Sequence, residues 1–414
     1  MKHIINTIIF FSLFMIAACE KGDPEIAPLD ELSVIGMSES FMCQPLAYTN
    51  HLVALIDNNN LNYLVNYDEQ GNKIWQRSVD EFIVPGLTYY NVNYLNLAKT
   101  ANSEIIIEMF IPRYNQSQQL VNQIIKAVNF DASGNFLWQF TDSIHQPDTM
   151  IINLDTIQVN SDFIAGGFVH LSTGNHLVVS SQIDTNIDST YIQLTAYGSN
   201  GVFINNSYLK LQGTRTIHDV YLTSNDEFFI YNSISDVSQS YILLDLSGNI
   251  IFEVAPPNLS FYENYFFHET SQGNFIISSS FFDEVANFKG VVFCINSSGN
   301  LLWSNNIDSP QALMMMSVQE KSDGLIFSGF NTGTALLAGV DWRTTFAQNK
   351  YTAVIQKIGL DGKEIWINRL QVISNTAGAA TVGADQIAFF GGKYDITIRS
   401  IYLLKFDASG QILN

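Results

Sequence analysis

The feature that most constrains this chain is a hairpin signature that recurs seven times along its 414 residues. Each copy is an apolar run, a turn that contains glycine, and a second apolar run. Asp or Asn opens five of the turns, where its side chain can bond the backbone two residues on. Glycine supplies the positive φ that such a turn needs. The turn glycines are Gly71, Gly134, Gly201, Gly248, Gly299, Gly362 and Gly410.

An aromatic residue stands four positions after the glycine in five of the seven copies. Four of the five tryptophans of the chain occupy this position, so we expect the aromatic to cover the same patch in every unit. Gly198 and Gly359 replace the Asp in two copies, and we expect those two turns to close differently. The aromatic residues are Trp75, Trp138, Phe252, Trp303 and Trp366.

A second turn, polar and short, precedes an apolar strand in every unit, so each unit holds four strands. Repeated four-stranded units predict an all-β fold, a seven-bladed β-propeller of antiparallel blades that spans residues 32–414. A β-helix would have shorter coils, and tandem sandwiches would need longer repeats. The first unit is expected to begin near Leu32 and the last to end on its own fourth strand. The ring is therefore expected to close by packing of the first blade on the seventh, without strand exchange.

The Asp-x-x-Gly-x-x-x-Trp unit, as in DASGNFLW ending at Trp138, resembles the repeats of bacterial PQQ-type propellers and related propeller lipoproteins. The resemblance covers nearly all of the chain after its N-terminal segment. It implies the fold and says little about function, because propellers host enzymes, scaffolds and lectins. Residues that would bind the PQQ cofactor are not found in the sequence, so no cofactor is predicted.

The N-terminus has the pattern of a secretory signal peptide over residues 1–18. Lys2 and His3 precede an apolar run that is too short to span a bilayer comfortably. Ile16-Ala17-Ala18-Cys19 also resembles the lipobox of bacterial lipoproteins, which implies cleavage before Cys19 and acylation of its thiol. Several acyl chains on one residue would hold the protein at a membrane. An ordinary signal peptide with a chance cysteine is the alternative.

Residues 19–31 are polar and without apolar periodicity, so they are interpreted as a tether. Glu20 follows the cysteine, where Asp would resemble the signal for retention in the inner membrane. An acidic stretch here resembles the surface-export signals of some Gram-negative lipoproteins. The predicted location is the outer membrane, with the cell surface favoured over the periplasmic face.

The amino-acid composition argues against two classes of partner and shows which residue types make the chain polar. The formal net charge of −20 argues against nucleic acid and against anionic membrane surfaces. Only 14% of residues are charged, and Asn, Ser, Thr and Gln supply most of the polarity. Cys43 and Cys294 lie far apart among strand residues, so buried free thiols are favoured over a disulfide.

Long connections are expected on one rim of the propeller, between second and third strands and between blades. They include the segments 110–123, 180–189 and 331–350. Loops on a rigid scaffold are where binding is usually found, and several of these carry aromatic residues or arginine. The candidate ligand-binding residues are Tyr89, Tyr90, Arg113, Tyr114, Tyr262, Asp341, Trp342 and Arg343. For each one alone, packing on neighbouring loops is the competing interpretation.

Motifs for catalysis or metal binding are not found. The sequence has no serine nucleophile elbow and no HExxH motif, so no catalytic residue is predicted. Histidines are scattered over the blades, and His145 and His268 are the two expected near the long-loop rim. Asp184-x-Asn186-x-Asp188 resembles the start of a calcium loop but lacks the glycine and the terminal Glu, so no metal site is predicted.

Three functional hypotheses remain at this point. The first is a non-enzymatic binding protein at the outer membrane, with a glycan or protein ligand on the long-loop rim. The second is a periplasm-facing scaffold, similar to the propeller lipoprotein of the outer-membrane barrel-assembly machinery. The third is a glycan-active hydrolase or lyase, which would need carboxylates, or His and Tyr, clustered in the funnel.

Overall fold

The computed structural model describes residues 33–413, with gaps at positions without a described placement. The gaps are residues 38, 44, 60, 84–93, 101–102, 115–119, 146–148, 153–154, 159–163, 185–188, 214, 235–237, 257–262, 283–287, 308–311, 333–351, 372–375, 384–385 and 395–398. Cys19 and the N-terminal tether therefore lie outside the described residues. Within those described, no helix has the length and apolar character to cross a bilayer.

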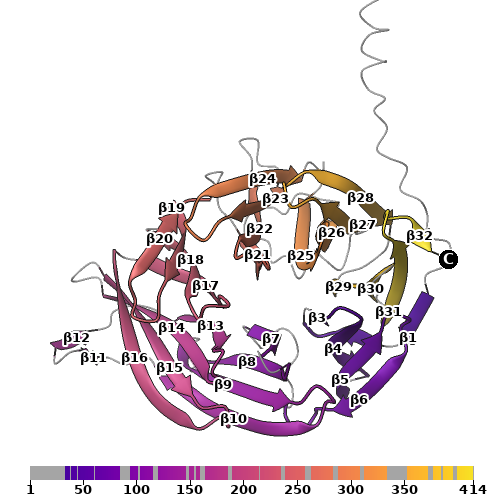
Figure 1. Cartoon of the computed structure of the whole chain (residues 1–414). Coiled ribbons are helices and arrows are strands. Elements are labelled where there is room, and N and C mark those ends of the chain that lie inside the picture. The colour runs from indigo at the N-terminus through magenta and orange to yellow at the C-terminus, as the bar shows by residue number, and fades with distance from the viewer. Residues whose placement is uncertain are drawn as a thin grey trace, which may run out of the picture.

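Antiparallel sheets stand around a central axis as the seven blades of a propeller, which confirms the predicted fold (Figure 1). Blade 1 consists of β2 (Glu39–Phe41) with β3 (Leu46–Ala47), β4 (His51–Asn58), β5 (Leu61–Asp68) and β6 (Lys73–Ser78). Blade 2 consists of β7 (Tyr94–Lys99), β8 (Ile105–Tyr114), β9 (Leu120–Phe130) and β10 (Phe136–His145). Blade 3 consists of β13 (Ile164–His170), β14 (His176–Asp184), β15 (Ser189–Tyr197) and β16 (Phe203–Gln212). A separate hairpin, β11 (Thr149–Ile152) and β12 (Asp155–Gln158), follows blade 2.

Blades 4 to 6 repeat this order, and blade 7 departs from it at its outer edge. Blade 4 consists of β17 (Arg215–Leu222), β18 (Phe228–Ile234), β19 (Ser238–Leu244) and β20 (Ile250–Val254). Blade 5 consists of β21 (Glu263–Glu269), β22 (Phe275–Phe282), β23 (Phe288–Ile295) and β24 (Leu301–Ile307). Blade 6 consists of β25 (Ala312–Lys321), β26 (Gly324–Thr332), β27 (Thr352–Ile358) and β28 (Glu364–Gln371). Blade 7 consists of β29 (Thr376–Val382), β30 (Gln386–Tyr394), β31 (Arg399–Asp407), β32 (Ile412–Leu413) and β1 (Ser33–Met37).

Ring closure is the point at which the sequence-based expectation is wrong. The outer edge of β31 pairs with β32 for two residues and then with β1, in the register Ser33↔Leu403 to Met37↔Ser400. The first strand of the chain therefore completes the last blade, and the first blade begins with β2. The sequence of β32 reads as a fourth strand, so the repeat pattern hid the fact that only Ile412 and Leu413 pair.

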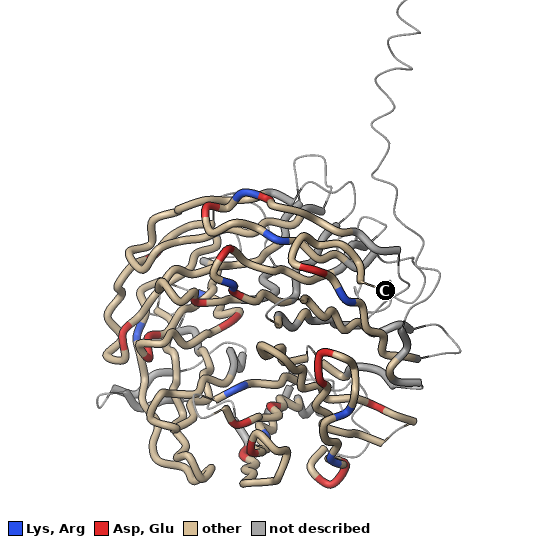
Figure 2. The backbone as a smooth tube through the Cα atoms, turned by 45° about the vertical axis from the view of Figure 1, so that its right-hand side comes forward, with Lys and Arg blue, Asp and Glu red and all other residues tan. Residues whose placement is uncertain are grey.

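In five of the glycine turns, the side chain of the residue that opens the turn also caps it. In blade 2, Asp131 Oδ1 accepts hydrogen bonds from the backbone N–H of Asn135 at 2.8 Å and of Ser133 at 2.9 Å. The backbone N–H and the side-chain amide of Asn135 lower the pKa of the Asp131 carboxyl. Gly134 has φ of +77°, as predicted for this position. Charged residues are sparse along the described backbone, and several lie at turns and strand ends (Figure 2).

The two turns without an opening Asp or Asn do not close differently, contrary to expectation. Gly198 and Gly359 make the same pair of backbone hydrogen bonds as the aspartates elsewhere. An acceptor two positions later takes over the capping: Asn200 Oδ1 accepts from Val202 N–H, and Asp361 Oδ1 accepts from Lys363 N–H, both at 3.2 Å. The turn therefore tolerates either position for its side-chain oxygen.

Each repeat aromatic packs on the turn glycine of the following blade. A Cβ built on Gly362 would lie 2.5 Å from the Trp303 ring, and one on Gly134 would lie 2.8 Å from Trp75. Trp303 Nε1 also donates to the carbonyl of Leu360 at 3.0 Å. The predicted common patch is thus the junction between neighbouring blades. At the seam, Ile35 of β1 covers Gly71 in the same way.

Serine clamps join neighbouring blades at the turns between first and second strands. Ser172, Ser224 and Ser271 each donate from backbone N–H and hydroxyl to a carboxylate of the next blade. The acceptors are Asp226, Glu269 and Glu320, at distances from 2.5 to 2.9 Å. Three consecutive blade junctions are fixed by the same device, which adds polar bonds to the apolar packing between sheets.

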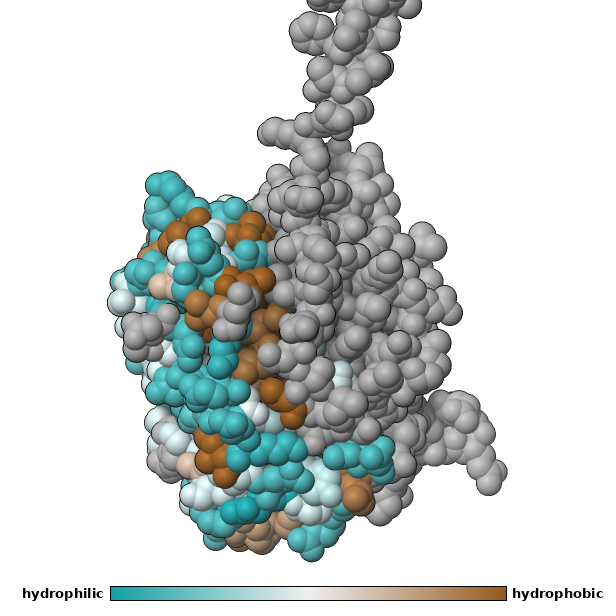
Figure 3. Space-filling model, turned by 90° about the vertical axis from the view of Figure 1, so that its right-hand side faces the viewer, coloured by the Kyte–Doolittle hydropathy of each residue, from teal (hydrophilic) through white to brown (hydrophobic). Residues whose placement is uncertain are grey.

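The outermost strands begin with exposed apolar side chains in all seven blades. They stand two or three positions after the turn glycine, beyond the reach of the neighbouring sheet, and apolar patches therefore interrupt the hydrophilic surface of the outer wall (Figure 3). The residues are Ile74, Phe136, Leu137, Phe203, Ile204, Ile250, Ile251, Leu301, Leu302, Ile365, Ile412 and Leu413. Polar turns next to these residues keep the wall from forming one continuous apolar surface.

Candidate functional site

The long-loop rim receives the connections between second and third strands and between blades, as predicted. Arg113 and Tyr114 are the last residues of β8, where they pair with Asn122 and Leu120 of β9. Two of the predicted loops are shorter than expected, because β8 runs to Tyr114 and β14 runs to Asp184. The other candidate binding residues lie outside the described residues, namely Tyr89, Tyr90, Tyr262, Asp341, Trp342 and Arg343.

Beneath this rim the interior of blades 3 to 6 changes from apolar to polar. Their second strands start at the tight turns with buried aliphatic and aromatic residues and continue toward the long loops with small polar ones. In β22, Phe275, Ile276 and Ile277 are followed by Ser278 and Ser279, all about 1% exposed. The corresponding buried polar residues of the other blades are Ser180, Ser181, Asn232, Ser233 and Ser328. Buried polar groups need partners. Asn232, Ser233 and Ser328 have side-chain hydrogen-bond partners, whereas Ser180 Oγ has none among the described residues.

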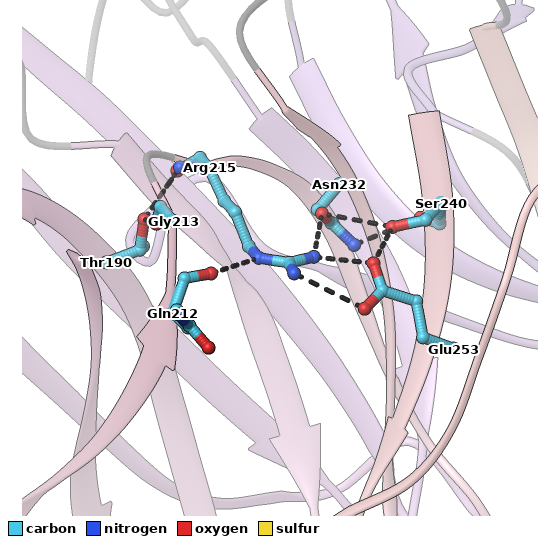
Figure 4. Close-up of polar contacts among 7 residues, drawn as sticks. All are labelled: Thr190, Gln212, Gly213, Arg215, Asn232, Ser240 and Glu253. Carbon is cyan, nitrogen blue, oxygen red and sulfur yellow. Dashed lines mark hydrogen bonds and ion pairs between the residues drawn. The ribbon is translucent and has the colours of Figure 1, made fainter. Parts of the chain in front are cut away.

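Arg215 organises the most extensive of these hydrogen-bond networks, at the junction of blades 3 and 4 (Figure 4). Its guanidinium crosses blade 4 and binds both carboxylate oxygens of Glu253, at 2.7 and 3.3 Å. Nη1 donates to Asn232 Oδ1 at 3.1 Å, and Nε donates to the carbonyl of Gln212 at 2.8 Å. Ser240 adds a donor to Glu253 at 2.7 Å. Strands β17 to β20 are thereby fixed to one another just below the rim.

The opposite face of β17 carries two polar side chains side by side. His218 is exposed, and its Nε2 lies 2.9 Å from Ser233 Oγ. Its ring centroid is 5.0 Å from that of Tyr231. Asp219 is half-buried, and burial raises the pKa of its carboxyl to about 7. With about 3.3 Å of rise per residue, this pair lies roughly 10 Å below the level of Arg215.

A pair of histidines lies between blades 2 and 3, away from the long-loop rim. His170 Nε2 is 2.6 Å from Glu108 Oε1, and His170 Nδ1 is 2.8 Å from His176 Nδ1. Nε2 of His176 is buried without a partner among the described residues. Burial and the nearby His170 lower the pKa of His176 to about 3. This chain of bonds joins the two blades, since Glu108 is on β8 and both histidines belong to blade 3.

Of the two histidines expected near the long-loop rim, the structure places one there and the other at the opposite rim. His145 ends β10 at that rim, as predicted. The placement of His268 is wrong, because it is the penultimate residue of β21 beside a tight turn, with Nε2 3.9 Å from Glu320 Oε2. The tight turn Thr270–Gly273 begins two residues after His268, so this end of β21 lies at the tight-turn rim.

Metal and cysteine predictions can be compared with the described part of the chain. There, no three His, Cys, Asp or Glu side chains come together in a way that could hold a metal ion. Asp184 ends β14, while Asn186 and Asp188 of the calcium-like motif lie outside the described residues. Cys43 and Cys294 are both buried free thiols, as predicted, and burial raises the pKa of Cys43 to about 12.

Sequence reasoning missed Arg215, Glu253, His218 and Asp219. Runs of polar residues within strands were the available signal, such as Ser278-Ser279-Ser280 and Asn232-Ser233 after three apolar positions. Pairing of Arg215 with Glu253, 38 positions apart, depends on the register of four strands and could not be read from one sequence.

Comparisons with known proteins give only distant structural likenesses. No family model and no curated protein matches the chain. A Bacteroides caccae protein of unknown function is similar in structure, with 12% identity and a TM-score of 0.41, over 78% of this chain and 94% of that one. The WD40 domain of Toxoplasma gondii coronin has 7% identity and a TM-score of 0.45, over 91% and 85%. The propeller domain of the Pyrococcus furiosus Trilobed protease has 8% identity and a TM-score of 0.36, over 78% and 92%.

Proposed function

We propose that this chain is a lipid-anchored binding propeller of the outer membrane, displayed at the cell surface, with a glycan or protein ligand on its long-loop rim. The observation that carries the proposal is the hydrogen-bonded polar layer beneath the rim, centred on Arg215. A rim whose supporting strands are fixed in this way presents its loops in a defined arrangement, which lowers the entropy lost on binding. Cys19 supplies the anchor, and residues 19–31 the tether.

Ligand binding is tested by replacing two aromatic residues of this rim together, Tyr114→Ala and Trp342→Ala. The double variant is expected to lose at least tenfold in affinity for the ligand found on glycan and protein arrays, because aromatic anchors contribute strongly to interfaces. Its melting temperature should stay near that of the wild type, because the two positions are assigned to the rim and not to the core between the blades. Unchanged affinity in a folded double variant would overturn the assignment of this rim.

Location is tested by protease treatment of intact cells beside lysed cells. Cleavage of the propeller on intact cells is expected, because the proposal places it outside. A Cys19→Ala variant is the control, and it should be recovered in soluble form. Protection until lysis would contradict surface display and favour the periplasm-facing scaffold, whose signature is co-purification with a membrane barrel.

A further inference from the structure

A bulge in the innermost strand of blade 4 turns two adjacent side chains to the same side. Ile217 and Val220 both pack in the apolar cluster between blades 3 and 4. Regular alternation would place residues three positions apart on opposite faces. The register shift between Ile217 and Asp219 explains why Ile217 and Val220 share a face. It also leaves His218 and Asp219 together on the face toward blade 5. Tyr231, which pairs with Asp219, packs in the cluster between blades 4 and 5 and confirms that side.

The two side chains differ in what they offer a ligand. His218 is exposed, so solvent reaches this place, and Ser233 orients its ring through the 2.9 Å contact to Nε2. Asp219 is half-buried beside it. The other titratable side chains described around this face are Tyr221 from β17 itself, Tyr231 from β18, Tyr241 from β19, and Glu269 from β21 near the tight turns. Glu269 already binds Ser224.

Asp219 differs from the other carboxylates placed deep in these blades. Glu253 is held by Arg215 at 2.7 Å, and Glu108 by His170 at 2.6 Å. Among the described residues, the Asp219 carboxyl has neither a hydrogen bond nor an ion pair. Burial of a carboxylate without a cation is costly, which is why its pKa is raised to about 7. A cationic ligand group would remove that cost, and a neutral one would do so only in part.

We propose that His218 and Asp219, on the innermost strand of blade 4, form a binding site for a primary ammonium group between blades 4 and 5. The proposal deepens the proposed function and rests on it, since the ligand would enter from the long-loop rim roughly 10 Å above. Asp219 binds the ammonium, and His218 borders it with a polar ring edge. The net charge of −20 raises the local concentration of cations. A lysine side chain and an amino sugar both carry this group.

The test is calorimetric titration of the full-length protein with two amines and their neutral counterparts. Glucosamine is compared with N-acetylglucosamine, and Nα-acetyl-lysine methylamide with its Nε-acetylated form. Amines are expected to bind and acetylated compounds are not. Affinity for the lysine derivative, whose amine stays protonated across this range, should rise about tenfold between pH 6 and pH 8, because the ionised fraction of Asp219 rises from about 0.1 to about 0.9 around its pKa of about 7. The better of the two amines identifies the source.

Two variants make the result specific to this site. Asp219→Asn should abolish amine binding and its pH dependence, and its melting temperature should be at least that of the wild type, because a charge is no longer buried. Asp131→Asn is the matched control, since Asn296 opens the equivalent turn of blade 5, and it should bind as the wild type does. Equal binding by Asp219→Asn, or no binding of either amine by the wild type at pH 8, would overturn the proposal.

The same measurements separate this site from the rim. If amines bind through Asp219 while arrays show no rim ligand, the proposed rim function fails and the ammonium site stands. An array ligand could instead lose its binding in the Tyr114 and Trp342 double variant while Asp219→Asn still binds it. That result would support the rim function and show that the ammonium site is not part of it.

Discussion

At the scale of single residues, the turn glycine and an aromatic ring of the preceding blade act as a pair at five of the seven blade junctions. The turn glycine is needed for its positive φ and also for the space that the preceding blade's aromatic ring occupies. These two requirements are separable in this chain. Gly362 has φ of +81° and lies against Trp303, whereas Gly273 has φ of +74° with no atom within 4 Å of a built Cβ.

Gly362→Ala and Gly273→Ala are therefore expected to differ in stability. Gly273→Ala should cost about 1 to 2 kcal/mol, which is the penalty of a left-handed backbone for an L-residue. Gly362→Ala should cost at least about 2 kcal/mol more, because Trp303 must also leave its position. Urea unfolding of both variants measures the difference. Equal losses would show that the ring contact adds nothing to the turn.

His176 gives the fold a dependence on pH at the junction of blades 2 and 3. Its folded pKa of about 3 lies below the ordinary value of 6.5, so the unfolded chain binds the proton more readily between these values. The stabilisation is complete above pH 6.5 and is lost as the pH falls toward 3, by up to about 1.4 kcal/mol per pH unit for one proton. Burial lowers the pKa of His51 and His268 as well, which adds to the same trend.

The measurement is the free energy of unfolding in urea from pH 7 to pH 4. His176→Asn is expected to flatten the slope below pH 6.5 relative to the wild type, whatever its effect at pH 7. The turn carboxylates contribute a slope of their own below about pH 5, and Asp219, whose pKa is raised to about 7, contributes one of opposite sign. Both are present in the wild type and in His176→Asn, so the difference between the two curves reports His176. Parallel curves for the two proteins would contradict the assignment.

At the scale of elements, the composite fourth strand of blade 7 decides whether the ring is closed. β32 contributes two paired residues, and β1 pairs with Ser400, Ile401, Tyr402 and Leu403. Without β1, the outer edge of β31 would be bare and Gly71 would lose its cover from Ile35. Both losses fall on the junction of blades 7 and 1.

Two truncations test this arrangement. Removal of residues 1–31 should leave the melting temperature of the propeller unchanged, because β1 begins at Ser33. Removal of residues 1–37 should lower it by several degrees or more, since it deletes a strand and exposes an edge. Thermal unfolding followed by circular dichroism compares the two forms. If both forms melt together, β1 does not contribute to closure.

At the scale of the whole molecule, the sequence was sufficient for whatever repeats and insufficient for whatever occurs once. Gly134 and Trp138 recur with their spacing, so blade number, strand order and turn position were predictable. Closure by β1 happens at a single place, and an irregular β32 looks like one more repeat. His170 and His176 meet Glu108 through the packing of two blades, and bulges such as that at His218 move single side chains to another face without any mark in the sequence.

The position of β1 also governs when the molecule can become complete. Ser33 pairs with Leu403, so nearly the whole chain must be present before the seam can form. Contacts of such sequence separation are slow to form, because the entropy of closing the largest possible loop must be lost first. Blades can assemble one after another, each against its predecessor, but the earliest strand waits for the latest. A chain interrupted before β31 therefore keeps β1 unpaired, and this unpaired strand would distinguish unfinished copies from finished ones.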